Sequence, residues 1–383
     1  MCGAKLVAAF PKENGIIGKR IKEPGHHVTA RREAMARRLK LTKFKHLNIN
    51  DPFFDSLKAG YQDFPVWFGR KSEEDLYIVD DDGRVSGMIY LKDEIGPVMD
   101  VDPPLPNRRW MKVGTLKIEG RGTKLGERVL KKIFDTALDR GLDGIYVTVF
   151  EVHQDLIRLF ERYGFKHHAN KSTDDGVEIV LVRDFSDTSG STLSNYPLIR
   201  ISDKKHWLLA VYPEYHSRLL PDSILTNESD EIVKDVSYTN TIHKMYIGGV
   251  PLTRMSVGDT IVIYRTSDKK APAYYRSVAT SVGIVEEVKS RSSFSSVDEF
   301  VRYASPHSVF TDEELADKFN KSPRLYTARF TYNAAFAKKM TRGRLLDEVG
   351  LSEQPRWDFR ELSTHQLRDI LRLGKLNERI VID

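Results

Sequence analysis

Apolar side chains recur every three or four positions between residues 125 and 138, while charged side chains occupy the positions between them. This spacing predicts an amphipathic helix with one buried stripe. Gly141 follows, a residue type that commonly ends a helix. The flanking run 111–118 is strand-like, and the run 144–150 is short and rich in β-branched and aromatic residues, which predicts a buried strand. The helical stripe consists of Leu125, Val129, Leu130, Ile133, Phe134, Ala137 and Leu138.

A turn containing two glycines joins the first strand to this helix, with the sequence Arg121-Gly122-Thr123-Lys124-Leu125-Gly126. The N–H groups at a helix start lack intrahelical partners and lie at the positive end of the helix dipole. Such a turn binds anions, a pyrophosphate among them, although it also occurs as a plain tight connection. After the strand at 144–150, a second helix carries apolar residues up to Tyr163 and ends at Gly164-Phe165.

The order strand, anion-binding turn, helix, strand, helix and Gly-Phe resembles the GNAT N-acetyltransferase superfamily. The resemblance covers about residues 46–185 and implies an α+β fold, with a mixed central sheet flanked by helices, in a domain of residues 46–186. The Asp81-Asp82-Gly83 turn supports a hairpin within it. The resemblance also implies a first strand at 46–50, short helices at 52–61 and 64–71, hairpin strands at 76–80 and 84–91, and a last strand at 177–184.

In this family a loop written Arg/Gln-X-X-Gly-X-Gly/Ala holds the pyrophosphate of acetyl-CoA through backbone amides. Arg121 and Gly126 match that loop, while Lys124 stands where the first glycine is usual. The resemblance further implies that the strand at 111–118 is splayed and offers main-chain groups to the pantetheine arm. The residues predicted to bind acetyl-CoA are Leu116, Ile118, Arg121, Gly122, Thr123, Lys124, Leu125 and Gly126.

The resemblance implies direct attack of an amine on the thioester, which needs a neutral amine and a proton for the leaving thiolate. A tyrosine often supplies that proton in the family, but this chain has Phe160 at the expected position. Tyr163 is the predicted donor instead, with a core aromatic as the structural alternative. His153 and Glu119 are the predicted residues that help to deprotonate the amine, and for both the alternative is a solvated surface position.

The second half of the chain has a different pattern. Residues 187–200 are small, polar and aperiodic, which is typical of a linker. In residues 201–383, short strands separated by Gly and Asp turns predict a small barrel, and a Ser-X-X-Gln capping box at 363–366 predicts a later helix. The run 252–264 with its Gly258-Asp259 turn resembles the PUA-like barrel group, ASCH domains included. Many members of that group bind RNA or modified nucleosides, so the resemblance implies an RNA-binding domain with accessory helices.

The charge is distributed unevenly. Residues 1–45 hold 12 Lys/Arg against 3 Asp/Glu, net +9; residues 46–200 hold 21 against 26, net −5; residues 201–383 hold 27 against 25, net +2. A basic N-terminal extension over residues 1–45 binds phosphates or is simply a solvated tail. In the last part, tyrosines are mixed with basic residues, as base stacking and phosphate binding require. The predicted nucleic-acid contacts are Arg31, Arg32, Arg37, Arg38, Lys244, Tyr246 and Arg254.

Composition excludes several classes of protein. Hydrophobic residues make up 40% and charged residues 30%, which is typical of a globular chain with a sizeable core. No apolar run is long enough to span a bilayer, and the amino terminus lacks a signal-peptide pattern, so we expect a cytoplasmic protein without membrane contact. Cys2 is the only cysteine, which excludes a disulfide framework and a cysteine-based metal site; no metal is predicted.

Three functional hypotheses follow. The first is an N-acetyltransferase that moves acetyl from acetyl-CoA to an amine on RNA or charged tRNA, a reaction that GNAT toxins also perform. The second keeps the enzyme but makes the acceptor a protein lysine or a small amine, with the barrel as a docking module, since the acidic middle segment suits a cationic acceptor. The third is a non-catalytic RNA-binding or acyl-CoA-sensing protein, suggested by Lys124 and Phe160 at positions where the family has other residues.

Overall fold

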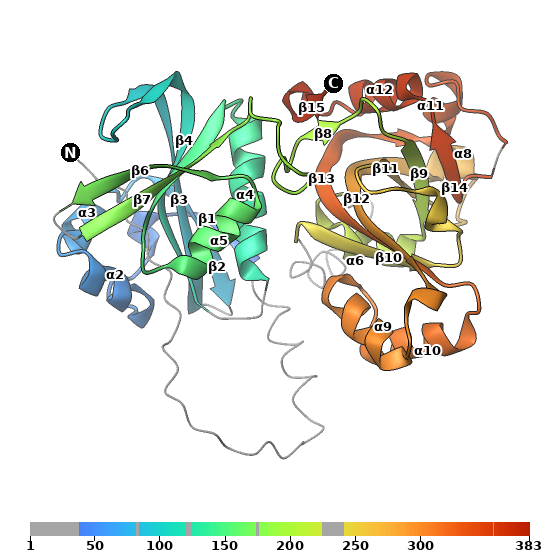
Figure 1. Ribbon diagram of the computed structural model, residues 1–383, viewed down its shortest axis with the longest axis horizontal. Coiled ribbons are helices and arrows are strands. Elements are labelled where there is room, and N and C mark those ends of the chain that lie inside the picture. Colours follow the sequence, from blue (N-terminus) through green and yellow to red (C-terminus); the bar gives the residue numbers. More distant parts are fainter. Residues whose placement is uncertain (1–37, 82–83, 120–123, 174–175, 224–240, 355) are drawn as a thin grey trace, which may run out of the picture. The chain divides into compact units, whose positions relative to one another are not determined.

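The computed structural model describes residues 38–81, 84–119, 124–173, 176–223, 241–354 and 356–383 (Figure 1). The chain divides into two compact units between Asn195 and Tyr196, inside the segment predicted as a linker. Each unit combines a sheet with helices, so the predicted α+β class is confirmed. In the described part of the chain, no helix is both long and apolar enough to cross a membrane.

The first unit is built on a seven-stranded mixed sheet with the strand order β1-β2-β3-β4-β5-β7-β6 (Figure 1). Its strands are β1 (Arg38–Lys43), β2 (Asp75–Asp81), β3 (Arg84–Val98), β4 (Leu105–Ile118), β5 (Gly144–Phe150), β6 (Lys166–Thr173) and β7 (Gly176–Asp184). Neighbouring strands are antiparallel except β4 and β5, which are parallel. A helix connects this pair, as parallel strands require.

Helices cover both faces of this sheet. They are α2 (Asp55–Gly60), α3 (Phe64–Arg70), α4 (Leu125–Asp139) and α5 (Gln154–Arg162). On one face, α2 and α3 pack a group of aromatic side chains against Leu76 and Ile78 of β2 and Tyr90 of β3. Tyr77 points to the opposite face because side chains alternate along a strand, and there its ring lies 4.7 Å from Nζ of Lys132 in α4.

Most of the expected elements of this unit are confirmed, including the helix at 125–138 and the strand at 144–150. The expected first strand at 46–50 is wrong, because there Asn48 Oδ1 accepts the N–H of Asn50 at 3.0 Å and closes a local turn. The first strand is β1, which pairs with β2. β6 was not predicted, since its sequence is polar and it lies at the sheet edge.

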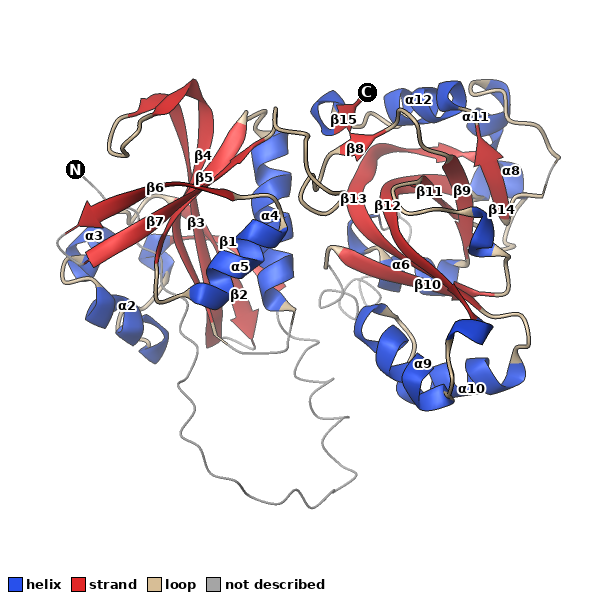
Figure 2. Cartoon of the chain, in the orientation of Figure 1, coloured by secondary structure: helices blue, strands red, loops and turns tan. Residues whose placement is uncertain are grey.

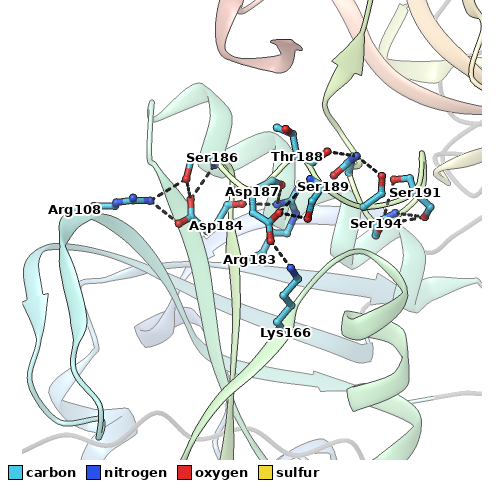
Figure 3. A network of polar contacts seen from close by, with 12 residues as sticks. Arg108, Lys166, Arg183, Asp184, Ser186, Asp187, Thr188, Ser189, Ser191 and Ser194 are labelled. Carbon is cyan, nitrogen blue, oxygen red and sulfur yellow. Dashed lines mark hydrogen bonds and ion pairs between the residues drawn. The ribbon is translucent and has the colours of Figure 1, made fainter. Parts of the chain in front are cut away.

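The segment after β7 is tied to the first unit by polar contacts (Figure 3). The Arg183 guanidinium donates to the carbonyl oxygen of Asp187 at 3.0 Å, and the Asp187 carboxylate forms an ion pair with Lys166. At Gly164, a Cβ would lie only 2.0 Å from the carbonyl oxygen of Ser194, and the backbone φ is +82°. Glycine is therefore required where this segment packs against the end of α5.

The second unit contains a six-stranded sheet with the order β10-β13-β12-β11-β9-β14 and a small parallel pair, β8 with β15. The strands are β8 (Ile199–Arg200), β9 (His206–Val211), β10 (His243–Gly248), β11 (Thr260–Arg265), β12 (Val278–Ser290), β13 (Tyr326–Thr341), β14 (Phe359–Leu362) and β15 (Val381–Ile382). Figure 2 shows that the long strands β12 and β13 bend strongly, giving the sheet a barrel-like curl. Its core includes Trp207, Ile261 and Phe330.

Accessory helices surround this sheet: α6 (Pro213–Leu219), α8 (Ala273–Arg276), α9 (Val297–Ala304), α10 (Asp312–Lys321), α11 (Arg342–Asp347) and α12 (Thr364–Leu373). The predicted capping box is confirmed at α12, where Ser363 and Gln366 exchange side-chain and backbone hydrogen bonds. The Gly258-Asp259 turn also has a structural explanation. Gly258 has a φ of +89°, and the buried Asp259 carboxylate accepts hydrogen bonds from Trp207 Nε1 and Ser256 N, both at 2.9 Å.

Candidate functional site

The parallel strands of the first unit separate partway along their length. Pairing joins residues 110–113 of β4 to residues 144–147 of β5 and then stops, although both strands continue. The pairing of β4 with β3 shifts register at the same place, where Gly114 is an extra residue. A Cβ on Gly114 would lie 2.7 Å from the Tyr90 ring, so this bulge requires glycine. Because bulges bend a strand and interrupt pairing, we attribute the splay to Gly114.

The turn before α4 lies at the end of the same strand, β4. Lys124, the N-cap residue, has left-handed backbone angles, φ 54° and ψ 16°. Glycine adopts this conformation with least cost, which explains why the position matches a glycine in the family loop. Burial lowers the pKa of the Lys124 ammonium to about 8, although the Glu127 carboxylate raises it. The predicted residues Arg121, Gly122 and Thr123 lie outside the described residues.

The other predicted cofactor residues anchor the elements around this turn. Leu116 and Ile118 are buried in the separated part of β4, and Leu125 is buried in the first turn of α4. At Gly126, a Cβ would lie 2.9 Å from Cδ2 of Leu159, which shows how closely α4 and α5 approach. Leu116, Ile118 and Leu125 thus lie on β4 and the start of α4 with their side chains in the core.

The structure does not bring the three predicted catalytic residues together. His153 caps the start of α5 and Tyr163 caps its end, so they are roughly 15 Å apart along the helix. Tyr163 is fully buried. His153 follows β5 directly, its N–H donates to the carbonyl oxygen of Phe150 at 3.0 Å, and burial lowers its pKa. Glu119 follows β4, and its carboxylate lies 3.1 Å from the ammonium of Lys117.

A buried carboxylate that sequence reasoning missed lies beside the separated strands. Glu178 of β7 is directly opposite Phe150, the last residue of β5, and its side chain is 1% exposed. The Tyr61 hydroxyl donates to Glu178 Oε1 at 3.4 Å, and the Tyr61 ring stacks on Phe150 with centroids 5.3 Å apart. A glutamate inside the apolar run 177–182 was a signal that could have identified it.

A network of charges lies further along the same sheet face. Lys112 of β4 is 3.8 Å from the carboxylates of both Glu94 and Asp100, and its ammonium lies 5.3 Å from the Tyr146 ring. The Tyr146 hydroxyl donates to Glu94, and Lys171 forms an ion pair with Asp100. Burial lowers the pKa of Lys112, while the two carboxylates raise it. In the described part of the chain, no group of three or more His, Cys, Asp or Glu residues is arranged to hold a metal ion.

The second unit has a pocket of about 1120 Å³. Tyr246 lines it, and burial raises the pKa of Tyr246 to about 12. Lys244 and Arg254 do not line the pocket: Lys244 is buried with Nζ 5.7 Å from the Tyr332 ring, and Arg254 lies 5.0 Å above the ring of Trp207. Arg31, Arg32 and Arg37 lie outside the described residues, and Arg38 begins β1 with its side chain outside the description.

Four of the aromatic and basic side chains of this pocket lie on β10, β11, α11 and a loop. The Tyr264 ring of β11 lies 5.2 Å from the ring of Trp357, and the guanidinium of Arg342 lies 4.5 Å from Trp357. All three residues line the pocket together with Tyr246. The wall can therefore present a flat aromatic surface and a cation side by side.

Comparison with known proteins agrees with the geometry of the first unit. Residues 41–165 match the model of the acetyltransferase (GNAT) family. The chain therefore contains a GNAT acetyltransferase domain, and this family match supports acetyl transfer in general. No curated protein matches the chain.

Several solved structures are similar to parts of the chain. The ASCH protein of Zymomonas mobilis is 13% identical, with 45% of this chain and 96% of that chain covered and a TM-score of 0.31. An IAA acetyltransferase of Bacillus cereus is 12% identical, with 39% of this chain and 99% of that chain covered and a TM-score of 0.28. A chain of the NatC complex bound to Gag peptide and CoA is 17% identical, with 38% of this chain and 98% of that chain covered and a TM-score of 0.28. The assignment of the first unit rests on the family match and on its geometry.

Proposed function

We propose that this protein is an N-acetyltransferase that transfers the acetyl group of acetyl-CoA to an amine. The observation that carries the proposal is the separation of β4 from β5 immediately before the Lys124 turn. In this arrangement the separated edges of β4 and β5 and the start of α4 lie at the same part of the sheet. The GNAT match over residues 41–165 supports the same activity.

The residues present fit acetyl-CoA. The N–H groups at the start of the 15-residue helix α4 suit a pyrophosphate, and the Lys124 ammonium adds a positive charge beside them. The main-chain groups of Leu116 and Ile118, in the separated part of β4, suit the amide groups of the pantetheine arm. When bound, acetyl-CoA supplies an activated thioester.

We assign the remaining predicted residues to proton transfer. His153 lies just beyond β5 and, with its pKa lowered by burial, is neutral at pH 7 and able to accept a proton. Glu119 lies beyond β4, on the other strand of the splay. Tyr163 is the proposed donor to the leaving thiolate, and its buried side chain lies at the C-terminal end of α5.

The acceptor that we propose is an amine carried by RNA, either a nucleobase or the amino acid of a charged tRNA. The pocket of the second unit supports this proposal, because aromatic rings such as Tyr246 and basic side chains line it, and these residue types stack on bases and pair with phosphate. A cationic protein lysine or small amine is the second candidate. It is favoured by the carboxylates of Glu94, Asp100 and Glu178 on the first unit's sheet face.

Transfer of a labelled acetyl group separates these acceptors. The full chain is incubated with acetyl-labelled acetyl-CoA and, in parallel, with total charged tRNA, deacylated tRNA, a lysine-rich protein or spermidine. Label in charged tRNA that is released by mild base points to the amino acid, whereas label that survives deacylation points to a nucleobase. Label in the protein or spermidine supports the second candidate, and acetyl-CoA binding without transfer to any of them supports a sensing protein.

A further inference from the structure

We propose that Glu178 is the catalytic residue that takes the proton from the acceptor amine, and that Tyr61 is the positioning residue that orients its carboxylate. This inference rests on the proposed acetyl transfer and adds a named base to it. Glu178 lies on β7, directly opposite the end of β5. The inference therefore takes the role of base away from His153 and Glu119 and gives it to Glu178.

The pairing register places Glu178 at the splay. β5 remains paired with β7 up to Phe150 opposite Glu178, three residues beyond the last pair that joins β5 to β4 at Val147. The side chains of Phe150 and Glu178 share a sheet face because residues directly opposite each other point the same way. Tyr61, the residue that ends α2, contacts both of them. Glu178 thus faces α2, on the sheet face opposite α4.

Two hydroxyl groups hold the Glu178 carboxylate. Tyr61 donates to Oε1 at 3.4 Å, and the Thr148 hydroxyl, on the neighbouring pair of the same sheet face, also donates to the carboxylate. Each oxygen of an ionised carboxylate accepts more than one hydrogen bond, so the group can still accept from the N–H of an amine.

Burial and the surrounding charges set the pKa of the Glu178 carboxylate. Burial raises its pKa above the ordinary value of a glutamate, although Lys171 and Lys112 oppose this effect. Lys171 faces Glu178 across the β6–β7 pairing, and both lysines are balanced by Asp100. Lys171, Lys112 and the Tyr61 hydroxyl are the titratable groups that affect the pKa of Glu178. A base with a pKa closer to neutrality is a better match for an amine near pH 7.

The proton and electron balance of the step is simple. Glu178 Oε2 takes one proton from the ammonium form of the acceptor, and the freed nitrogen lone pair forms the bond to the acetyl carbon. The carbon–sulfur bond breaks, and its electron pair leaves with sulfur. The second proton lost by the nitrogen goes to that thiolate, and Glu178 returns its own proton to solvent.

Glu178→Gln tests the inference, with Glu161→Gln on the exposed side of α5 as the matched control. With the acceptor that the labelling experiment identifies, we expect kcat/KM at pH 7 to fall about 100-fold in Glu178→Gln. The Kd for acetyl-CoA should stay at the wild-type value, and Glu178→Asp should recover part of the rate. Glu161→Gln should behave as wild type.

The pH dependence of unfolding gives a readout that does not require turnover. Because the folded pKa of Glu178 is raised, the folded state holds this proton more tightly than the unfolded state, and stability is lost as pH rises from about 4.5 through the raised pKa. Glu178→Gln should remove this loss and be at least as stable as wild type at pH 7.

The outcomes separate this inference from the proposed function. Wild-type transfer together with an unchanged kcat/KM in Glu178→Gln overturns the inference alone. So does a Glu178→Gln variant that is less stable than wild type at pH 7 and loses activity only in proportion to its unfolded fraction. If the wild-type chain transfers no acetyl group to any acceptor, the proposed function fails and the inference fails with it.

Discussion

Lys124 combines a left-handed backbone with a half-buried ammonium at the start of a helix. Left-handed angles cost a residue with a Cβ roughly 1–2 kcal/mol, and the ammonium is partly desolvated, so the position is unfavourable twice over. An anion bound at the helix start would compensate for the desolvation of the ammonium. The charge of Lys124 should therefore strengthen the binding of acetyl-CoA.

We predict that acetyl-CoA binds more weakly as pH rises through about 8, because the Lys124 ammonium then loses its proton. The loss should be about tenfold, the size of one charge-assisted hydrogen bond to a phosphate. Calorimetric titrations at pH 7 and pH 9 measure it. Lys124→Gly should bind about tenfold more weakly at pH 7 and show little further change, while Lys132→Gln, two turns along α4, should keep the wild-type pH response. A pH-dependent loss that persists in Lys124→Gly would contradict this role.

Among the elements, the Gly258-Asp259 turn is the clearest case of a motif explained by structure. The Asp259 carboxylate accepts hydrogen bonds from Trp207 Nε1, from Ser256 N and from Lys205 N, the last at 3.2 Å. Two segments of the second unit, residues 205–207 and 256–259, meet at this one buried side chain. The turn thus holds β9 and β11 in their parallel register.

We predict that Asp259→Ala destabilises the second unit by about 3 kcal/mol, because it leaves buried donors without an acceptor. Urea unfolding followed by tryptophan fluorescence measures the change, and hydrogen exchange locates it in β9 and β11. Asp317→Ala, which removes an exposed ion pair with Lys321, should change stability by less than about 0.5 kcal/mol. Equal effects of the two substitutions would show that Asp259 is not a structural centre.

Elements with a strong local pattern could be predicted from sequence, and those that depend on distant partners could not. The stripe from Leu125 to Leu138 predicts α4 because a helix is specified by its own residues. β1 was missed because its leucines alternate with basic residues in an edge strand. The bulge at Gly114 and the position of Glu178 opposite Phe150 follow from strand register, which joins residues far apart in the chain. For this reason helix α4 was predictable, whereas the position of Glu178 opposite Phe150 was not.

At the scale of the whole molecule, a GNAT acetyltransferase domain is followed by a second unit with its own core and pocket. The two-part organisation followed from the change in sequence pattern near residue 187. In our account the first unit supplies the acetyl chemistry and the second selects the carrier of the amine. Binding of acetyl-CoA at the start of α4 is the claim on which the rest depends.

The most direct test of that claim is a calorimetric titration of acetyl-CoA into the full chain and into Gly126→Glu and Gly126→Gln. Both substitutions meet Leu159 in the same way, and only the glutamate adds a negative charge at the proposed pyrophosphate site. The account predicts one-to-one binding to wild type, measurable binding to Gly126→Gln and no detectable binding to Gly126→Glu. Equal affinity of the glutamate and glutamine variants for acetyl-CoA would contradict it.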